Sequence, residues 1–176
     1  MDELLKVDDT FNESMFISKV NNTMVMLHTS IMLNDLNRVR HFISDDLEKK
    51  YEGILNELNN KNETQMYDEF NVKSTSISDI NIDGNIIEID VDVTLKYMDY
   101  IVNKDTGDFI RGNNKSRIEK KYLLKFVKII NKKYNGKTFE CTNCGATLDI
   151  NNTGMCPYCR KVFKAEDYDY ILTEII

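Results

Sequence analysis

The hydrophobic period of the sequence changes near residue 70, and this change restricts the chain to folds in which helices precede a sheet. Before that point, apolar positions recur every three or four residues, as on one face of a helix. This face comprises Phe16, Val20, Thr23, Leu27 and Ile31. Later, apolar and polar residues alternate, most clearly from Ile87 to Tyr97, as is typical of an antiparallel strand with one wet face. The pattern predicts an α+β domain.

Individual elements have recognisable ends. Thr10 and Glu13 form a capping box, which predicts that the first long helix begins there. Ser44 is placed to cap a later helix, and a short helix is expected between the two. Strands are expected at about residues 70–80, 87–97, 116–130 and 167–176, with turns at Asp83-Gly84 and Asp105–Gly107.

Composition excludes several classes of protein. The chain has 176 residues, 41% of them hydrophobic, and a net charge of −6, which is typical of a globular protein and argues against a dedicated DNA-wrapping protein. Residues 1–10 are too acidic for a secretory signal, and the longest uncharged run, Val20–Asn34, is too short to span a bilayer. We therefore expect a cytoplasmic chain without a signal peptide or transmembrane helix, and its attachment to a membrane surface stays open.

Four cysteines form the most specific motif. Cys141, Cys144, Cys156 and Cys159 follow the spacing C-x2-C-x11-C-x2-C, which predicts a closed four-thiolate cage for one structural Zn²⁺. Disulfides and a redox dithiol are disfavoured because no secretion signal and no strand–helix context accompany the motif. Iron suits the same four thiolates, so the choice between zinc and iron stays open.

The residue after each cysteine pair is expected to adopt a positive φ. Gly145 does so freely, whereas Arg160 holds the equivalent place at a cost of about 1–2 kcal/mol. Structural zinc binding contributes roughly 10–16 kcal/mol, so the site should tolerate this arginine.

The cysteines lie between the two strands expected last, at 116–130 and 167–176. A zinc ribbon has neighbouring ends and can replace the turn of a hairpin without disturbing the strands. We therefore expect one α+β domain, residues 1–136 and 167–176, with a zinc ribbon inserted at 137–166.

Several segments resemble a known family. The order of helices and strands resembles the cone-shaped fold of nuclear transport factor two and the cystatin-like proteins. Met98–Val102, Asp105–Gly107, Gly112 and Lys121–Val127 resemble the C-terminal domain of the mitochondrial import subunit Tim44. The cysteine segment and the closing Asp167–Leu172 resemble those of bacterial relatives that carry a ribbon. Glycine is usual at Arg160 in such chains, and tryptophan is frequent at Tyr170.

The resemblance implies a peripheral, transport-associated binding domain with an apolar pocket between the helices and the sheet, and it implies no catalytic residues. Its ligand would be a lipid or a protein segment. We expect the pocket, if present, to be lined by Met24, Leu27, His28, Ile31, Tyr97 and Phe126. An ordinary core is the alternative for these side chains. A small-molecule enzyme built on the same cone is the alternative function, and it would need polar groups around His28.

Positive charge is concentrated before the cysteines. Residues 111–137 carry a net charge of +9 and the remainder −15. We expect the acidic face of the neighbouring strand to neutralise most of the basic strand, leaving Lys132, Lys133 and Lys137 as candidates for contact with an anionic membrane surface. Nucleic-acid binding through the ribbon is the weaker alternative. Leu123, Val127 and Ile129 form an apolar cluster that indicates contact with the ribbon, with a partner protein, or with a second copy of the chain in a homodimer through the sheet.

Overall fold

The computed structural model describes residues 2–130, 138–141, 143–149, 156–160 and 169–176. Three helices come first: α1 (Asp2–Val7), α2 (Glu13–Met32) and α3 (Asp45–Asn60), with a 3-10 helix (Leu36–Arg38) between the last two. Three long strands follow: β1 (Glu63–Asp83), β2 (Ile86–Asn103) and β3 (Phe109–Ile129). The short strands β4 (Thr138–Glu140) and β5 (Thr147–Asp149) precede the final strand β6 (Ile171–Ile175). The predicted order of helices and strands is confirmed.

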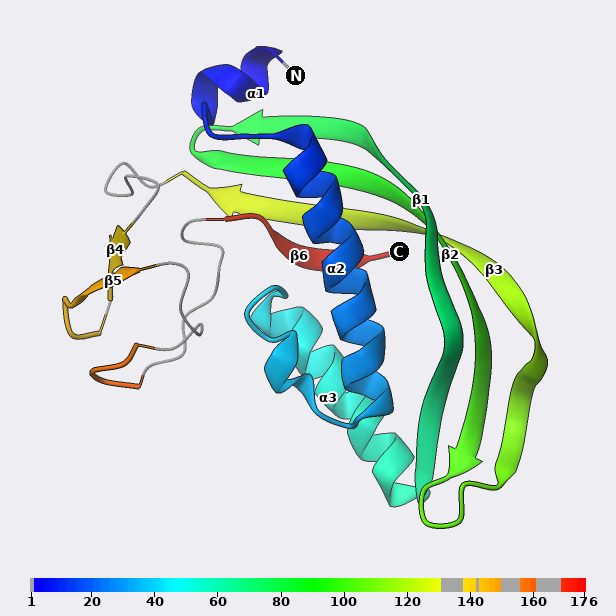
Figure 1. The fold of residues 1–176 in the computed structure, drawn as a ribbon. Coiled ribbons are helices and arrows are strands. Elements are labelled where there is room, and N and C mark those ends of the chain that lie inside the picture. Colours follow the sequence, from blue (N-terminus) through cyan, green and yellow to red (C-terminus); the bar gives the residue numbers. More distant parts are fainter. Residues whose placement is uncertain (1, 131–137, 142, 150–155, 161–168) are drawn as a thin grey trace.

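A curved antiparallel sheet forms one wall of the molecule. Its strand order is β1-β2-β3-β6, and α2 and α3 lie on its concave side (Figure 1). Residues 42–44 cover the outer edge of β6: Leu172 donates its backbone N–H to Phe42, and Ser44 donates to Leu172 (2.8 and 2.9 Å). This arrangement is the predicted α+β cone.

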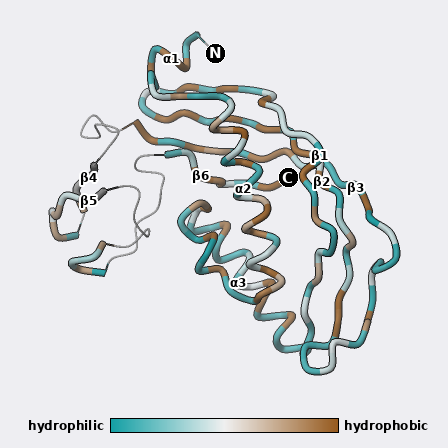
Figure 2. The backbone as a smooth tube through the Cα atoms, in the orientation of Figure 1, coloured by the Kyte–Doolittle hydropathy of each residue, from teal (hydrophilic) through white to brown (hydrophobic). Residues whose placement is uncertain are grey.

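The core lies between the concave face and the helices. Apolar and polar residues alternate along the strands (Figure 2), and the apolar set of β2 is buried. Phe126 of β3 pairs in register with Ile89 of β2, and Phe16 of α2 packs edge-on against the Phe126 ring at 5.5 Å. The period-2 pattern therefore predicted the correct face of the sheet.

One of the two predicted helix caps is confirmed, and the other is wrong. Ser44 caps α3 as predicted, its hydroxyl accepting from the Leu47 N–H at 3.3 Å. The cap of α2 is Asn12, whose side chain accepts from the Met15 N–H at 3.0 Å, so the prediction of a Thr10 cap was wrong. The Thr10 hydroxyl is engaged elsewhere, because it donates to the Asp8 carboxylate at 2.6 Å.

Strands β1 and β3 are longer than predicted, and β3 contains a sharp irregularity. Asp99 pairs with Asn113 while Tyr97 pairs with Ile118, so the two partners are five positions apart on β3 and two apart on β2. Gly112, at φ +104, precedes this bulge, and a Cβ there would lie 2.5 Å from the Asp99 carbonyl oxygen. Bulges of this kind bend a strand and increase its twist.

The four cysteines lie in the connection between β3 and β6. Val127 pairs with Ile171 at the base of that hairpin, and β4 pairs with β5 beyond it. The predicted place of the cysteine segment, in the last hairpin, is therefore confirmed, while its status as a separate domain stays a prediction. Within the part of the chain that the structure describes, no helix combines the length and apolar character needed to cross a membrane.

Candidate functional site

The four cysteine sulfurs converge on one point. Cys141 Sγ lies 3.6 Å from Cys159 Sγ, and Cys144 Sγ lies 3.7 Å from Cys156 Sγ. All four sulfurs lie within 4.8 Å of one another. A tetrahedral ion with metal–sulfur bonds of about 2.3 Å would separate its ligands by about 3.8 Å, so the spacing suits a four-coordinate metal.

The two cysteine pairs have the same backbone geometry. The Gly145 N–H donates to the Cys141 carbonyl and the Arg160 N–H to the Cys156 carbonyl, both at 2.8 Å. Gly145 has φ +71 and Arg160 has φ +59. The expected positive φ is therefore present at both places, including the one that carries a side chain.

Electrostatics within the cluster favour a bound cation. Backbone N–H groups of Asn143 and Cys144 lower the pKa of Cys141. The Ala146 N–H acts in the same direction on Cys144, but burial and the other three sulfurs outweigh it and raise the pKa of Cys144 to about 12. Four thiolates this close repel one another, and a divalent ion removes that repulsion. Zn²⁺ or Fe²⁺ suits the donor set, and four protein ligands leave no open position for catalysis.

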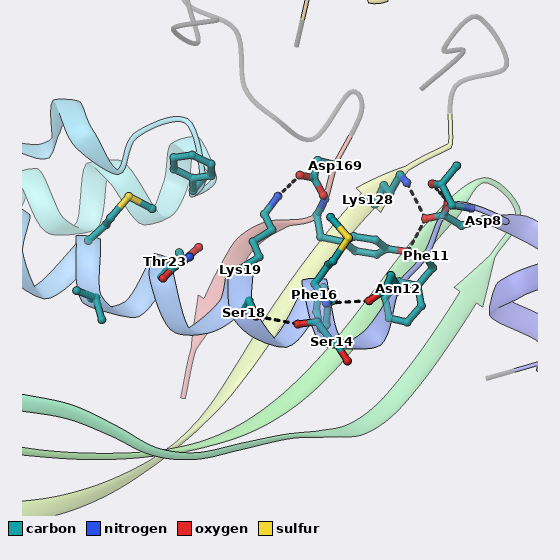
Figure 3. A pocket seen from close by; sticks show the side chains of 17 residues that line it. Asp8, Phe11, Asn12, Ser14, Phe16, Ser18, Lys19, Thr23, Lys128 and Asp169 are labelled. Carbon is teal, nitrogen blue, oxygen red and sulfur yellow. Dashed lines mark hydrogen bonds and ion pairs between the residues drawn. The ribbon is translucent and has the colours of Figure 1, made fainter. Parts of the chain in front are cut away.

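A second candidate site is a cavity of about 770 Å³ along α2 (Figure 3). Its wall follows α2 from Asn12 to Met26, about 21 Å at 1.5 Å per residue. The remaining wall combines the rings of Phe11, Phe42 and Tyr170 with the polar side chains of Asp8, Thr10, Lys128 and Asp169. The cavity is within the size range of small-molecule and cofactor sites.

One end of the cavity is closed by a buried polar cluster centred on Asp8. Its carboxylate accepts from Lys128 Nζ at 2.6 Å, from the Tyr170 hydroxyl at 2.9 Å and from the Thr10 hydroxyl at 2.6 Å. Burial raises the pKa of Asp8, but these donors outweigh it, so the pKa lies below its usual value. Burial and the neighbouring Asp8 raise the pKa of Tyr170.

Lys19 and Thr23 lie near the middle of the cavity wall (Figure 3). The Lys19 ammonium forms an ion pair with Asp169 and lies 5.8 Å from the centre of the Phe42 ring. Burial lowers the pKa of Lys19, and Asp169 offsets this only in part. The hydroxyl of Thr23 is fully buried and has no hydrogen-bond partner among the described residues.

The residues predicted to line a pocket lie in the core instead. These are Met24, Leu27, His28, Ile31, Tyr97 and Phe126, all less than 10% exposed, and none of them lines the cavity along α2. Four of them belong to the face of α2 that packs on the sheet, and Tyr97 and Phe126 belong to the buried face of β2 and β3. The cavity is lined by other residues of the same helix.

His28 is held as a neutral, buried ring. Its Nδ1–H donates to the Met24 carbonyl at 2.8 Å, and the rings of Tyr67, Phe70 and Tyr97 surround it. Burial lowers its pKa to about 4. A histidine bonded to its own helix and unprotonated near neutral pH is a core side chain.

Most of the basic strand is neutralised by neighbouring acids, as predicted. Lys125 pairs with Glu88 at 3.0 Å, Lys120 with Asp99 at 2.9 Å, and Arg117 with Glu69 of β1 at 3.3 Å. The candidate anion contacts Lys132, Lys133 and Lys137 lie outside the described residues. Leu123, Val127 and Ile129 are half-buried, and their role in a homodimer stays a prediction.

Sequence reasoning missed the cavity and its charged residues. One signal was available: Lys128 continues the alternation of Leu124 and Phe126, so it falls on the buried face of β3. A lysine at a buried strand position needs a carboxylate partner. The partner, Asp8, lies 120 positions away in the chain, and no local pattern indicates that contact.

Comparison with known proteins identifies the family to which the α+β cone belongs. The family model described as the Tim44-like domain matches residues 1–137, more than half of the chain. The chain belongs to the Tim44-like family. A solved structure, the intermembrane space region of the chloroplast protein ARC6, is 10% identical with a TM-score of 0.34, covering 66% of this chain and 87% of that chain. No curated protein matches.

Proposed function

We propose that this Tim44-like chain is a non-catalytic, transport-associated binding domain that receives an apolar ligand in the cavity along α2. The observation that carries the proposal is the cavity itself: about 770 Å³, largely apolar, and built on the fold of this family. Tim44-like domains are in general non-catalytic and act in transport in association with proteins and membranes. The buried, neutral His28 gives no support to the enzyme alternative.

Ligand entry is tested with a neutral fluorescent probe, N-phenyl-1-naphthylamine, whose emission rises in an apolar site. We expect saturable binding to the full chain and a weaker signal in Val25→Glu, which places a charge in the cavity wall. Leu33→Glu is the matched control, because Leu33 is an exposed apolar residue near the end of the same helix and does not line the cavity. Equal binding by all three proteins would refute the proposed site.

We also propose that residues 137–166 form a zinc ribbon whose metal is structural and is held by Cys141, Cys144, Cys156 and Cys159. The convergence of the four sulfurs and their paired backbone geometry support this proposal. The family match ends at residue 137, where the proposed ribbon begins. Native mass spectrometry of protein purified without chelator should find one zinc ion per chain; finding iron or no metal would refute it.

An anionic membrane surface is the proposed cellular setting, with Lys132, Lys133 and Lys137 as the contacts. The net charge of +9 over residues 111–137, which include these three lysines, supports this assignment. Flotation with vesicles containing 30% anionic lipid tests the proposal, using a triple Lys→Gln variant. The same loss of binding in Lys49→Gln, on the far helix α3, would show that the contact is not specific.

A further inference from the structure

The distribution of polar and apolar side chains over the two faces of the sheet reverses along β2, near Tyr97. In the first half of the strand, Val91 and Leu95 are buried against the helices. The residues between such positions, Asp90 and Asp92 among them, lie on the convex face, because side chains alternate along a strand. This is the usual arrangement of an antiparallel sheet with one wet face.

In the second half of the strand, the helix side of the sheet is polar. Lys120 lies 5.7 Å from the centre of the buried Tyr97 ring and donates to Asp99 at 2.9 Å. Arg111 of β3 donates to both carboxylate oxygens of Glu63, at 2.5 and 2.6 Å. Because side chains continue to alternate, the apolar residues of this half lie on the convex face.

Five apolar side chains gather on the convex face at this end of the sheet. They are Met66, Met98, Tyr100, Val102 and Phe109, which we call the convex patch. Their positions pair in the register of β1, β2 and β3, and paired residues share a face. The ring of Tyr100 lies 6.3 Å from that of Phe109, which is 49% exposed.

None of the described helices covers the convex patch. The helices α2 and α3 lie on the concave side (Figure 1), and the five side chains do not belong to the hydrophobic core. A contiguous apolar cluster outside the core marks an interaction surface.

Positive charge lies beside the convex patch toward the middle of the sheet. Lys96 of β2 and Lys121 of β3 are on the same face, on either side of Glu119. That carboxylate is also bound by Lys73 at 2.7 Å, which lowers its pKa most, and the two other lysines lower it further. Three lysines around one carboxylate leave this end of the patch positive.

The turn between β2 and β3, at the opposite end of the patch, is acidic. Asp105 and Asp108 are exposed there. Asp105 accepts from the amide of Asn62 and Asp108 from the hydroxyl of Thr106, both at 2.7 Å, and these neutral donors leave the charges in place. The lysine of the turn, Lys104, donates to α3 at 2.8 Å and so points to the helix side.

A face that is positive at one end, apolar in the middle and negative at the other is complementary to a copy of itself rotated by half a turn. Apolar side chains then meet apolar side chains, and each positive end meets a negative end. Two sheets can pack face to face in this way. The stretch from Lys96 to Asp105 is about 30 Å long, and three strands are about 14 Å wide, so the interface is small and the dimer should be weak.

We propose that the convex patch is the interface of a homodimer in which two sheets pack face to face with their strands antiparallel. Lys96 and Lys121 of one copy then face Asp105 and Asp108 of the other. This surface is separate from the cavity along α2 and from the cysteine cluster, so the proposal is independent of the proposed function.

Sedimentation equilibrium of the full chain at about 5–500 µM tests the proposal. We expect a monomer–dimer equilibrium that shifts toward monomer at high salt, because charged contacts are screened. Met66→Lys should weaken the dimer about tenfold or more, because it places an unpaired charge in each half of the interface. Leu123→Lys is the matched control, on the same face of the sheet but outside the patch, and should leave the dimer unchanged.

Exchanging charges tests the relative orientation of the two copies. Lys96→Glu should weaken the dimer a few-fold, and Lys96→Glu/Asp105→Lys should restore it, since opposite charges then face each other again. A monomer at every concentration would overturn the proposal. So would a dimer that is lost in Leu123→Lys and kept in Met66→Lys, because the interface would then lie at the other end of the sheet. If Met66→Lys does not fold, the two Lys96 variants decide.

Discussion

At the scale of single residues, Asp8 joins parts of the chain that are far apart in sequence. It lies between α1 and α2, yet it binds Lys128 at the end of β3 and Tyr170 at the start of β6. Both strands of the last hairpin are thereby anchored to the N-terminal segment at the end of the cavity. Removing one member of a buried charge pair is costly, because the other charge is left without a partner.

Replacing Asp8 tests this anchoring. Asp8→Asn leaves the Lys128 ammonium buried and unpaired, so we expect the free energy of unfolding to fall by about 3–5 kcal/mol. The double variant Asp8→Asn/Lys128→Met should recover most of this loss, because it removes the orphaned charge. Urea denaturation measures the free energy of unfolding of the single and the double variant. A double variant as unstable as the single one would contradict the explanation.

His28 makes stability depend on pH. Its pKa is lowered to about 4 in the folded chain against about 6.5 in the unfolded chain. Between these two pH values the unfolded chain binds a proton at His28 that the folded chain does not bind. The free energy of unfolding is therefore unaffected by His28 above pH 6.5, and it decreases by roughly 3 kcal/mol as the pH falls toward 4. Urea denaturation of wild type and His28→Phe between pH 7.5 and 4.5 should show a flatter profile for the variant; parallel profiles would contradict this assignment.

Gly112 is a position that only glycine suits. An added Cβ would meet the backbone of Asp99 and Tyr100 at 2.5 Å, and φ is +104. Gly112→Ala should therefore destabilise the protein by more than about 1–3 kcal/mol, the cost of backbone strain alone. Gly53→Ala is the control: nothing lies within 4 Å of that Cβ and the site is inside α3, so we expect stabilisation of about 0.5–1 kcal/mol. Thermal melts compare the two.

At the scale of elements, β3 uses its lysines in two different ways. Lys125 is paired across the outer face with Glu88, whereas Lys128 points to the helix side and closes the cavity. The cysteine pairs likewise share one backbone geometry but differ in sequence, since Gly145 and Arg160 adopt the same left-handed conformation. The left-handed conformation is therefore strained at Arg160, which has a side chain, and unstrained at Gly145.

Arg160 should weaken the metal centre slightly. Its left-handed conformation costs roughly 1–2 kcal/mol that a glycine would avoid. The chain adopts this conformation when the four sulfurs assemble around the metal, so the cost reduces the free energy of metal binding. Arg160→Gly should therefore tighten Zn²⁺ binding by roughly 5–30-fold. Competition with a chelator of known affinity measures the change. The reciprocal variant Gly145→Arg should weaken binding by a similar factor, and an unchanged affinity in both would contradict the role of strain.

At the scale of the whole molecule, two hydrophobic clusters are separate. The main core joins the helices to β1, β2, β3 and β6, while the cysteines form a cluster of their own with Ala146. The sheet, the anchoring by Asp8 and the cavity are all assembled from residues outside 137–166. We expect the cone to be stable independently of the cysteine segment.

Excising the proposed ribbon tests this independence. Replacing residues 131–168 with a four-residue turn keeps Lys128, Asp169 and Tyr170, and it shortens the loop that must close between β3 and β6. The free energy of unfolding should stay the same or rise by up to about 2 kcal/mol. Circular dichroism and urea denaturation are the measurements. A chain that no longer folds would show that the ribbon contributes to the cone.

Much of this protein was predictable from local patterns. Alternation from Ile87 to Tyr97 identified the buried face of β2, Ser44 marked the start of α3, and the paired cysteines identified the metal-ligand candidates. Each signal depends on residues a few positions apart, where backbone geometry alone decides which side chains share a face or a turn. The short helix α1 was missed, and so was the Asn12 cap, because Thr10 and Glu13 match the capping-box pattern although the Thr10 hydroxyl donates to Asp8 in the structure.

The cavity and its charges were decided by tertiary structure. Hydrophobic periodicity shows that α2 has an apolar face, and it placed Met24, Leu27 and Ile31 there, but it does not show whether that face borders a sheet or an open space. That depends on how α2, residues 42–44 and the hairpin formed by β3 and β6 meet, and on long-range pairs such as Asp8 with Lys128. The sequence by itself determined the elements, the sheet face and the cysteine cluster, because these follow from spacing along the chain. Only packing between distant segments decided where the chain leaves room for a ligand.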